Sequence, residues 1–205
     1  MKIQFAFRLV HIDNIPHILQ DGIVHKNSPK ANKDYITIGD TSIINTRETK
    51  LFWDGKVIGD FIPFYFGNKS PMLYVIQKGY NGVKQYHPED IVYCVIKIED
   101  IIKHQLKCCF TDGHALTACT KIYDGIHLNR LNELVKHKDV YAPYWIDEND
   151  RDLKRRKEAE LLMEDEIPPH LITGFVVYND NAKNKLLAWG VDVNKIHIGP
   201  NYYFL

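Results

Sequence analysis

Residues 90–98 read DIVYCVIKI, an almost unbroken apolar run rich in β-branched residues. A run of this length and composition predicts a buried strand. Further strands are predicted at residues 3–11 (IQFAFRLVH), 171–178 (LITGFVVY) and 195–199 (KIHIG). Residues 57–66, VIGDFIPFYF, are also rich in β-forming residues, and Pro63 within them indicates an edge strand or a strand start.

Helical signals are shorter than the strand signals. Short helices are predicted at residues 14–22, 99–106 and 181–190, and a near-helical apolar stripe at positions 126, 128, 131, 134 and 135. Residues 72–76 fit either a strand or a short helix that begins at Ser70 and Pro71. Strands outnumber long helices and do not alternate strictly with them, which favours a mixed α+β fold. The length of 205 residues fits a single domain over residues 1–205.

Residues 25–50 are polar and show no clear period. We expect a loop there, and loops of this length in compact domains are often binding loops or lids.

The charge balance argues against a general nucleic-acid coat protein. Lysine plus arginine equals aspartate plus glutamate at 26 each, whereas non-specific DNA binders are strongly basic. Local basic clusters occur at Lys26, Lys30 and Lys33, at Lys136 and Lys138, and at residues 154–157. Each cluster taken alone is more typical of a solvated face.

The compartment expected from the sequence is the cytoplasm. No apolar run approaches the roughly 18 residues that a membrane span needs, and the N-terminus lacks the pattern of a signal peptide. None of the four cysteines forms a CxxC pair, which favours reduced thiols. The spacing of His104, Cys108, Cys109 and His114 matches no standard zinc site, and we expect no metal.

Standard nucleotide and hydrolase motifs are absent from the sequence. No GxGxxG follows a strand, and no GxxxxGK[ST], GxSxG or HExxH occurs. His11 ends the first predicted strand and could point at a ligand, although a structural histidine is favoured. Arg47 in the polar stretch could bind phosphate, although an exposed arginine is commoner. Among the aromatic residues of 61–74, Phe64 and Phe66 are favoured as core.

Glu160 lies in RDLKRRKEAELLMEDE, residues 151–166. In a helix or in a strand its face is partly apolar. A carboxylate in such a place has a raised pKa unless it is paired, and it could act as a base. The local charge run nevertheless favours a salt-bridged surface glutamate.

Six stretches resemble, in order, the DarT family of bacterial toxins that ADP-ribosylate bases in single-stranded DNA. They are VHIDNIPHILQDGI (10–23), FIPFYFGNKSPMLYVI (61–76), CFTDGHALTACT (109–120), APYWIDENDRD (142–152), RRKEAELL (155–162) and GPNYYFL (199–205). The stretches span nearly the whole chain. The resemblance implies an ADP-ribosyltransferase fold, with a split two-sheet core, peripheral helices and NAD⁺ bound in a cleft as co-substrate without a metal.

The resemblance also implies roles for individual residues. Glu160 matches the catalytic glutamate at the start of a strand, which orients the nicotinamide ribose and takes a proton from the attacking base. Arg47 matches a catalytic loop arginine near the phosphates. The NAD⁺ contacts implied are His11 on the adenosine-side ribose, its neighbours Asp13, Asn14 and Gly22, and the nicotinamide-pocket residues Tyr65, Met72 and Tyr74. His114 and Lys69 match DNA-side or active-site positions, and Lys69 replaces a family arginine, so a bidentate contact is lost there.

The implied activity is transfer of ADP-ribose from NAD⁺ to thymine in single-stranded DNA, which blocks replication. Guanine in DNA, RNA or protein are alternative acceptors, and a non-enzymatic nucleotide or nucleic-acid binding module is a more distant alternative. The implied partner is a cognate macrodomain antitoxin that removes ADP-ribose.

Overall fold

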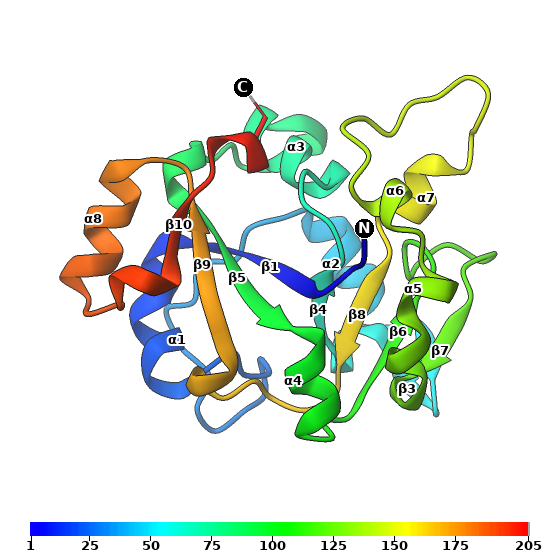
Figure 1. The fold of residues 1–205 in the computed structure, drawn as a ribbon, viewed down its shortest axis with the longest axis horizontal. Coiled ribbons are helices and arrows are strands. Elements are labelled where there is room, and N and C mark those ends of the chain that lie inside the picture. Colours follow the sequence, from blue (N-terminus) through cyan, green and yellow to red (C-terminus); the bar gives the residue numbers. More distant parts are fainter. Residues whose placement is uncertain (205) are drawn as a thin grey trace.

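A large mixed sheet runs through the middle of the computed structural model, which describes residues 1–204 (Figure 1). Within these residues one eight-stranded sheet has the order β10-β9-β5-β1-β4-β8-β6-β7, and β2 and β3 form a small second sheet. The strands are β1 (Phe5–His11), β2 (Leu51–Trp53), β3 (Lys56–Val57), β4 (Ile62–Tyr65), β5 (Ile91–Lys97), β6 (Cys108–Thr111), β7 (Ile122–Asp124), β8 (Glu160–Met163), β9 (Ile172–Val177) and β10 (Ile196–Ile198). The predicted α+β class and the predicted strands are confirmed.

Short helices surround this sheet. They are α1 (Ile15–Asp21), α2 (Thr41–Arg47), α3 (Pro71–Lys78), α4 (Ile98–Lys103), α5 (Leu131–Leu134), α6 (His137–Val140), α7 (Leu153–Lys157) and α8 (Asp180–Ala188). The stripe predicted from residue 126 begins as a 3-10 helix over Gly125–Arg130 and continues as α5. Figure 1 shows α8 beside β9 and β10 and the α6–α7 region near the opposite half of the sheet.

Both faces of the central strands are covered, and this explains the unbroken apolar run of β5. Ala6 and Val10 of β1 belong to a core on one face, together with residues of α1, α4, α5 and α8. Phe7 and Leu9 belong to a second core on the other face, together with Leu73 of α3. A strand that is buried on both faces does not need to alternate apolar and polar residues.

The large sheet is nearly split between β1 and β4. These strands pair at a single position, Phe7 with Tyr65, whereas β4 pairs with β8 along its whole length. Pro63 is the second residue of β4, which agrees with the predicted strand start, whereas the alternative of an edge strand is wrong because β4 lies between β1 and β8. A proline is tolerated here because the side of Pro63 that lacks an N–H donor faces the gap between β1 and β4, where no strand partner needs that donor. The Pro63 carbonyl on this side accepts a hydrogen bond from Arg8 Nη1 at 3.0 Å.

Residues 72–76 form a helix. Ser70 caps α3 by accepting a hydrogen bond from the Leu73 N–H at 3.2 Å, and Pro71 occupies the first turn. The helix ends at Gly79, which adopts the left-handed conformation at φ 68°.

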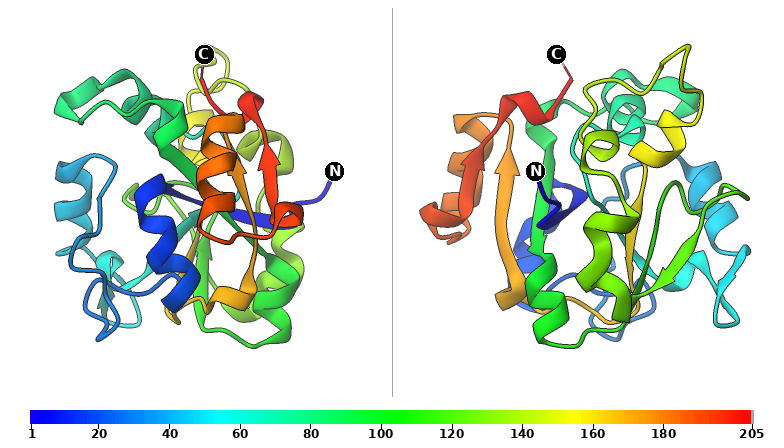
Figure 2. Two further views of the ribbon diagram at one scale, coloured as in Figure 1. Left: turned by 90° about the vertical axis from the view of Figure 1, so that its left-hand side faces the viewer. Right: turned by 45° about the vertical axis from the view of Figure 1, so that its right-hand side comes forward.

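The polar stretch 25–50 is not wholly a loop, and that expectation is corrected. It contains α2, which Asp40 caps by accepting from the Ser42 and Ile43 N–H groups at 2.8 and 3.4 Å. The helix buries none of its residues, so it has no apolar period to reveal it. In the left view of Figure 2 this segment (light blue) lies on the same side of the sheet as α3.

Candidate active site

Glu160 is fully buried at the first residue of β8. Its exposed fraction is 0%, and it pairs in register with Tyr65 of β4. Its backbone N–H donates to the Thr111 hydroxyl at 3.0 Å, and this hydroxyl donates to the Gly113 carbonyl at 2.6 Å. The strand placement implied by the resemblance is confirmed, and the locally favoured surface glutamate is wrong. A run of neighbouring charges does not reveal that one of them turns into the core.

The carboxylate of Glu160 has a partner for each oxygen. Oε1 accepts from the Ala115 N–H at 3.0 Å, and Oε2 lies 2.9 Å from Arg47 Nη2. Burial is the largest single influence on Glu160 and opposes its ionisation, but Arg47, His114 and the Ala115 N–H together outweigh burial, so the pKa of Glu160 lies below its ordinary value. The group is therefore an anion at neutral pH.

Arg47 comes from the last turn of α2. Its side chain is 12% exposed, although an exposed loop arginine is commoner for such a sequence. The pair joins a helix from the polar stretch 25–50 to a strand near the end of the chain. No local sequence signal could have predicted that contact.

A cavity of about 490 Å³ lies against Arg47, the partner of Glu160 in this pair. Its walls come from the segment 17–48, from β1 and β4, from α3 and from α7. The sequence-predicted residues that line it are Gly22, Arg47, Tyr65, Met72 and His114. The structure thus gathers five of the candidates around one space.

Tyr65 and Met72 form one wall of the cavity. The Tyr65 hydroxyl donates to the Met72 sulfur at 3.6 Å. Burial raises the pKa of Tyr65 well above its ordinary value, so the phenol stays neutral. A flat, neutral ring and a polarisable thioether are suited to contact with a planar heteroaromatic group.

Tyr74 does not face this cavity, in contrast to the prediction. It packs in an aromatic cluster, with ring centroids 5.5 Å from Trp145 and 5.2 Å from Phe204. Met72 and Tyr74 would share a face in a strand, but two residues apart on α3 they point to different sides. The structure does not bring Tyr74 to this cavity, and its role in the nicotinamide pocket stays a prediction.

Lys69 belongs to the same cluster as Tyr74. Its ammonium lies 5.6 Å from the centre of the Phe204 ring, and it is not among the cavity residues. The position has a positive φ of 49°. The predicted role of Lys69 at the DNA side or active site stays a prediction.

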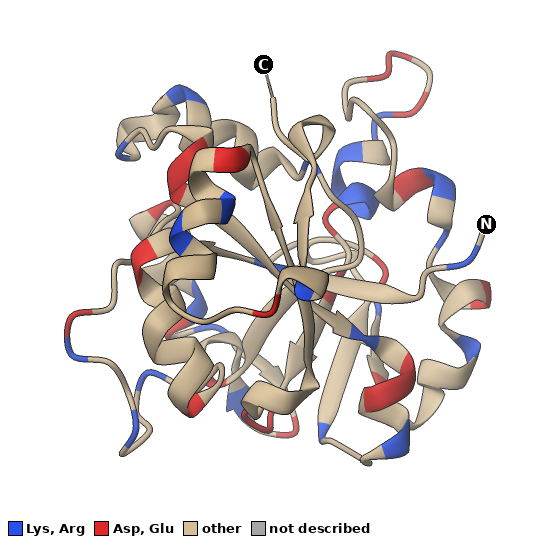
Figure 3. Cartoon of the chain, turned by 60° about the vertical axis from the view of Figure 1, so that its left-hand side comes forward, with Lys and Arg blue, Asp and Glu red and all other residues tan. Residues whose placement is uncertain are grey.

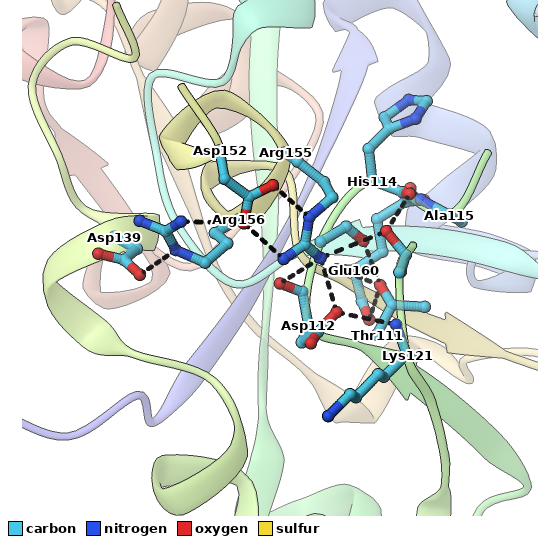
Figure 4. A network of polar contacts seen from close by, with 12 residues as sticks. Thr111, Asp112, His114, Ala115, Lys121, Asp139, Asp152, Arg155, Arg156 and Glu160 are labelled. Carbon is cyan, nitrogen blue, oxygen red and sulfur yellow. Dashed lines mark hydrogen bonds and ion pairs between the residues drawn. The ribbon is translucent and has the colours of Figure 1, made fainter. Parts of the chain in front are cut away.

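His114 lies at the cavity in a turn that follows β6 (Figure 4). Its backbone N–H donates to the Arg155 carbonyl at 2.9 Å, and Arg155 Nη1 donates to Asp112 Oδ1 at 2.8 Å. These bonds hold the turn against α7 and place the Ala115 N–H at Glu160. Burial lowers the pKa of His114, so its ring is mostly neutral at pH 7.

The predicted site residues of the first stretch, 10–23, lie partly at the cavity and partly away from it. His11 is 8% exposed, and its Nδ1 accepts from the Asp13 N–H at 3.2 Å. The Asn14 amide clamps the backbone of Ile36 with bonds of 2.8 and 2.9 Å, which fixes the segment 25–40 against α1. Gly22 lines the cavity with φ 85°. Contacts of His11, Asp13 and Asn14 with NAD⁺ stay predictions.

The basic cluster at residues 154–157 is largely committed to structural contacts. Arg155 bonds to Asp112 and Asp152, Arg156 bonds to Asp139, Asp150 and Asp152, and Lys157 donates to three backbone carbonyls. Lys154 is the member that lines the cavity.

The cavity residues that were not predicted from the sequence include Arg8 and Glu158. Arg8 lines the cavity beside the gap in the sheet, and Glu158 lines it next to α7. Arg8 stands in an apolar strand, where a lone charge is a detectable signal. Glu158 stands inside a charge run, which hides it.

The comparisons with known proteins agree with this site. A family model described as "ssDNA thymidine ADP-ribosyltransferase, DarT" matches residues 7–204. The "DNA ADP-ribosyl transferase" of Escherichia coli O127:H6 (strain E2348/69 / EPEC) is 30% identical over 203 residues, 97% of this chain and 92% of the relative. A "DNA ADP-ribosyl transferase-DNA ADP-ribosyl glycohydrolase fusion protein" of Thermosipho africanus (strain H17ap60334) is 27% identical over 97% of this chain and 49% of its own length.

Solved structures of Thermus sp. 2.9 DarT have the same fold. The complex with ADP-ribosylated ssDNA matches with a TM-score of 0.82 at 25% identity, over 98% of this chain and 97% of that chain. The complex with NAD⁺ matches with a TM-score of 0.79 at 25% identity, over 100% and 99%.

The nearly split sheet and the buried Glu160–Arg47 pair beside a cavity define a site of the ADP-ribosyltransferase class. The match over residues 7–204 goes further: the chain belongs to the DarT family of single-stranded DNA thymidine ADP-ribosyltransferases. The resemblance stated from the six stretches is confirmed. Among residues 1–204, the structure has no helix of the length and hydropathy of a membrane span and no group of three His, Cys, Asp or Glu side chains arranged for a metal ion.

Proposed function

We propose that this chain is an NAD⁺-dependent mono-ADP-ribosyltransferase that modifies thymine in single-stranded DNA. The observation that carries the proposal is the buried Glu160–Arg47 ion pair beside the cavity. It occurs in a chain of the DarT family whose solved relative from Thermus sp. 2.9 is in complex with ADP-ribosylated ssDNA.

The residues around the cavity fit NAD⁺ as co-substrate. The volume of about 490 Å³ lies within the range of roughly 300–1,000 Å³ common for small-molecule sites. Tyr65 and Met72 offer a neutral wall for the nicotinamide ring, and Arg47 offers a guanidinium for phosphate oxygens. The Thermus sp. 2.9 relative is in complex with NAD⁺.

The chemical role of Glu160 follows from its charge. Breaking the bond between nicotinamide and ribose develops positive charge on the ribose, as in glycoside hydrolysis. A carboxylate that is already ionised and fixed by the Ala115 N–H can stabilise that charge without reorganising. Arg47 keeps Glu160 ionised, and because Arg47 also lines the cavity, its guanidinium can contact a phosphate oxygen while the ion pair stays in place.

A single strand of DNA suits the shape of the site better than a duplex. A base inside a duplex cannot reach the cavity without leaving the stack. His114 and Lys154 line the cavity and can contact the target base of the single strand or the adjacent phosphate. The cartoon in Figure 3 shows Lys and Arg interspersed with Asp and Glu along the chain, which agrees with a short local contact rather than a long electrostatic track.

A cognate antitoxin is part of the proposal. The Thermosipho africanus fusion protein joins a DNA ADP-ribosyl transferase to a DNA ADP-ribosyl glycohydrolase, and this chain covers 49% of it. We infer that a separate macrodomain protein with glycohydrolase activity reverses the modification made by this chain. Replication would be blocked in the cytoplasm, where NAD⁺ and replicating DNA meet, until the antitoxin removes ADP-ribose.

Mass spectrometry of modified nucleic acid tests the proposal. The protein is incubated with NAD⁺ and mixed-sequence single-stranded DNA, with duplex DNA, RNA and a carrier protein in parallel. The expected result is one ADP-ribose on single-stranded DNA alone, which fragmentation places on thymine. An adduct on guanine, RNA or protein would overturn the acceptor, and NAD⁺ binding with no nicotinamide released with any acceptor would favour a binding module.

A further inference from the structure

Glu158 is a second buried carboxylate at the same cavity. It follows the last residue of α7 and stands two residues before Glu160. Its exposed fraction is 9%, and it lines the cavity. Within residues 1–204 its carboxylate has no hydrogen bond and no ion pair; nearby charges act on it only through space. The oxygens of Glu158 are not sealed in the core but open onto the cavity, so a group bound in the cavity can contact them.

Glu158 and Glu160 differ in whether their carboxylate oxygens are available to accept a proton. Both oxygens of Glu160 have partners in Ala115 and Arg47, and the side chain has no exposed surface. A carboxylate held ionised in this way stabilises positive charge well but is a weak proton acceptor. Glu158 opens onto the cavity with its acceptor atoms free.

Charged and titratable groups from several elements surround Glu158. They are Lys154 and Lys157 of α7, Glu160 of β8 and Tyr65 of β4, with His114 of the turn after β6 lining the same cavity. The Lys157 ammonium donates to the carbonyls of Asn68, Val140 and Ala142, and is therefore committed to the protein backbone. Lys154 lines the same cavity as Glu158, as do the cationic side chains of Arg8, Lys26 and Arg47.

The proposed reaction needs a proton acceptor that is close to the target base. The ring N–H of thymine belongs to an imide, and its nitrogen attacks carbon poorly until the proton leaves. We propose that Glu158 accepts this proton, while Glu160 stabilises the positive charge on the nicotinamide ribose. The inference rests on the proposed function and divides between two carboxylates the work that the family resemblance gives to Glu160.

The step balances as follows. The thymine nitrogen loses its proton to the Glu158 carboxylate and forms a bond to the anomeric carbon of the nicotinamide ribose. The bond from that carbon to nicotinamide breaks, and its electron pair stays on the nicotinamide nitrogen. Neutral nicotinamide leaves, ADP-ribose remains on thymine, and Glu158 returns its proton to water.

The electrostatic setting agrees with this role. Burial raises the pKa of Glu158 to about 7, with Lys154 opposing the rise and Glu160 adding to it. A general base is most effective when its pKa lies near the working pH. The ionised form is the proton acceptor, so the rate of transfer should rise with pH through about 7.

Glu158→Gln tests the inference, because it keeps the size of the side chain but cannot take the proton. Transfer to single-stranded DNA and NAD⁺ hydrolysis in the absence of DNA are measured from pH 5.5 to 9 for wild type, Glu158→Gln and Glu160→Gln. Thermal unfolding and binding of ADP-ribose control for the fold and the cavity. Water is in excess and attacks an already cleaved ribose, so hydrolysis needs Glu160 more than Glu158.

The expected result for Glu158→Gln is a loss of transfer of about 10²- to 10⁴-fold, the usual contribution of a general base. Glu158→Gln should retain most of the NAD⁺ hydrolysis, and its rate of transfer to DNA should no longer increase with pH through 7. Glu160→Gln should lose both hydrolysis and transfer. Transfer by Glu158→Gln at the wild-type rate, with the wild-type pH profile, would overturn the inference and leave the proposed function standing. A wild-type protein that forms no DNA adduct would instead overturn the proposed function, and the inference with it.

Discussion

Replacement of Arg47 by methionine removes the cation that faces the buried carboxylate of Glu160. The two side chains are 12% and 0% exposed, and the atoms Nη2 and Oε2 are 2.9 Å apart. Removing one partner of a buried ion pair costs about 3–5 kcal/mol, because the remaining charge loses its compensation. Helix α2 buries no residue and can give way to let water in. We therefore expect the lower end, about 3 kcal/mol.

The expected loss is measurable by thermal unfolding. For a chain of this size about 3 kcal/mol lowers Tm by about 6–12 °C. The loss should depend on pH. In the wild type the lowered pKa of Glu160 gives stability that is present above its unfolded pKa and lost as the pH falls. In Arg47→Met the charge of Arg47 no longer opposes burial, so the pKa of Glu160 rises, and the deficit should be largest at neutral pH and shrink towards pH 4–5.

Two further variants make this test specific. Arg47→Met combined with Glu160→Gln should recover most of the lost Tm, because no buried charge remains. Arg130→Met breaks an ion pair with Glu133 that is 56% and 64% exposed, and it should cost at most about 1 kcal/mol. If Arg47→Met unfolds at the same temperature as Arg130→Met at pH 7, the buried ion pair does not exist in solution.

Three other substitutions have definite expected outcomes. Ser70→Ala removes the cap of α3 at the Leu73 N–H, and urea unfolding should show a loss of about 1 kcal/mol; an unchanged midpoint would contradict the cap. Gly22 has φ 85°, and Gly22→Ala would place a Cβ 2.1 Å from the Ile167 carbonyl oxygen. The substitution should lower the free energy of unfolding by at least about 1–2 kcal/mol in the same assay. An unchanged free energy of unfolding would show that the backbone at Gly22 has another conformation. Glu158→Gln removes an acid whose pKa is raised from 4.5 to about 7 in the folded protein. The free energy of unfolding of the variant should therefore equal that of the wild type at pH 5 and exceed it by up to about 3 kcal/mol at pH 8. A variant that is less stable than the wild type at pH 8 would contradict the burial of Glu158.

The strands were predictable because their signal is local. The run of β5 is apolar on both faces and β-branched, and these properties need no knowledge of the partner strands. Helix α2 was missed because it packs no apolar face, and its signal was limited to a capping aspartate. An edge strand was one of the two predictions for Pro63, because the gap between β1 and β4 cannot be read from the sequence of one strand.

The site was less predictable than the fold because burial of a charged side chain is a tertiary property. Glu160 looked solvated in its charge run, and its partner Arg47 lies in a distant segment of unassigned structure. The resemblance to the DarT family predicted that both residues belong to one site, and the structure brings their side chains to within 2.9 Å of each other. It did not place Tyr74, whose direction depends on α3 being helical, and it gave no role to Glu158.

The measurement that tests the account most directly is the formation of the DNA adduct by Glu160→Gln. Single-stranded oligonucleotides are incubated with NAD⁺ and either protein, and adduct and free nicotinamide are quantified over time at pH 8. The variant keeps the shape of the side chain but lacks the charge that is buried beside the cavity. The account predicts adduct and nicotinamide from the wild type and neither from Glu160→Gln, with both proteins folded. Adduct formed by Glu160→Gln at the wild-type rate would contradict it.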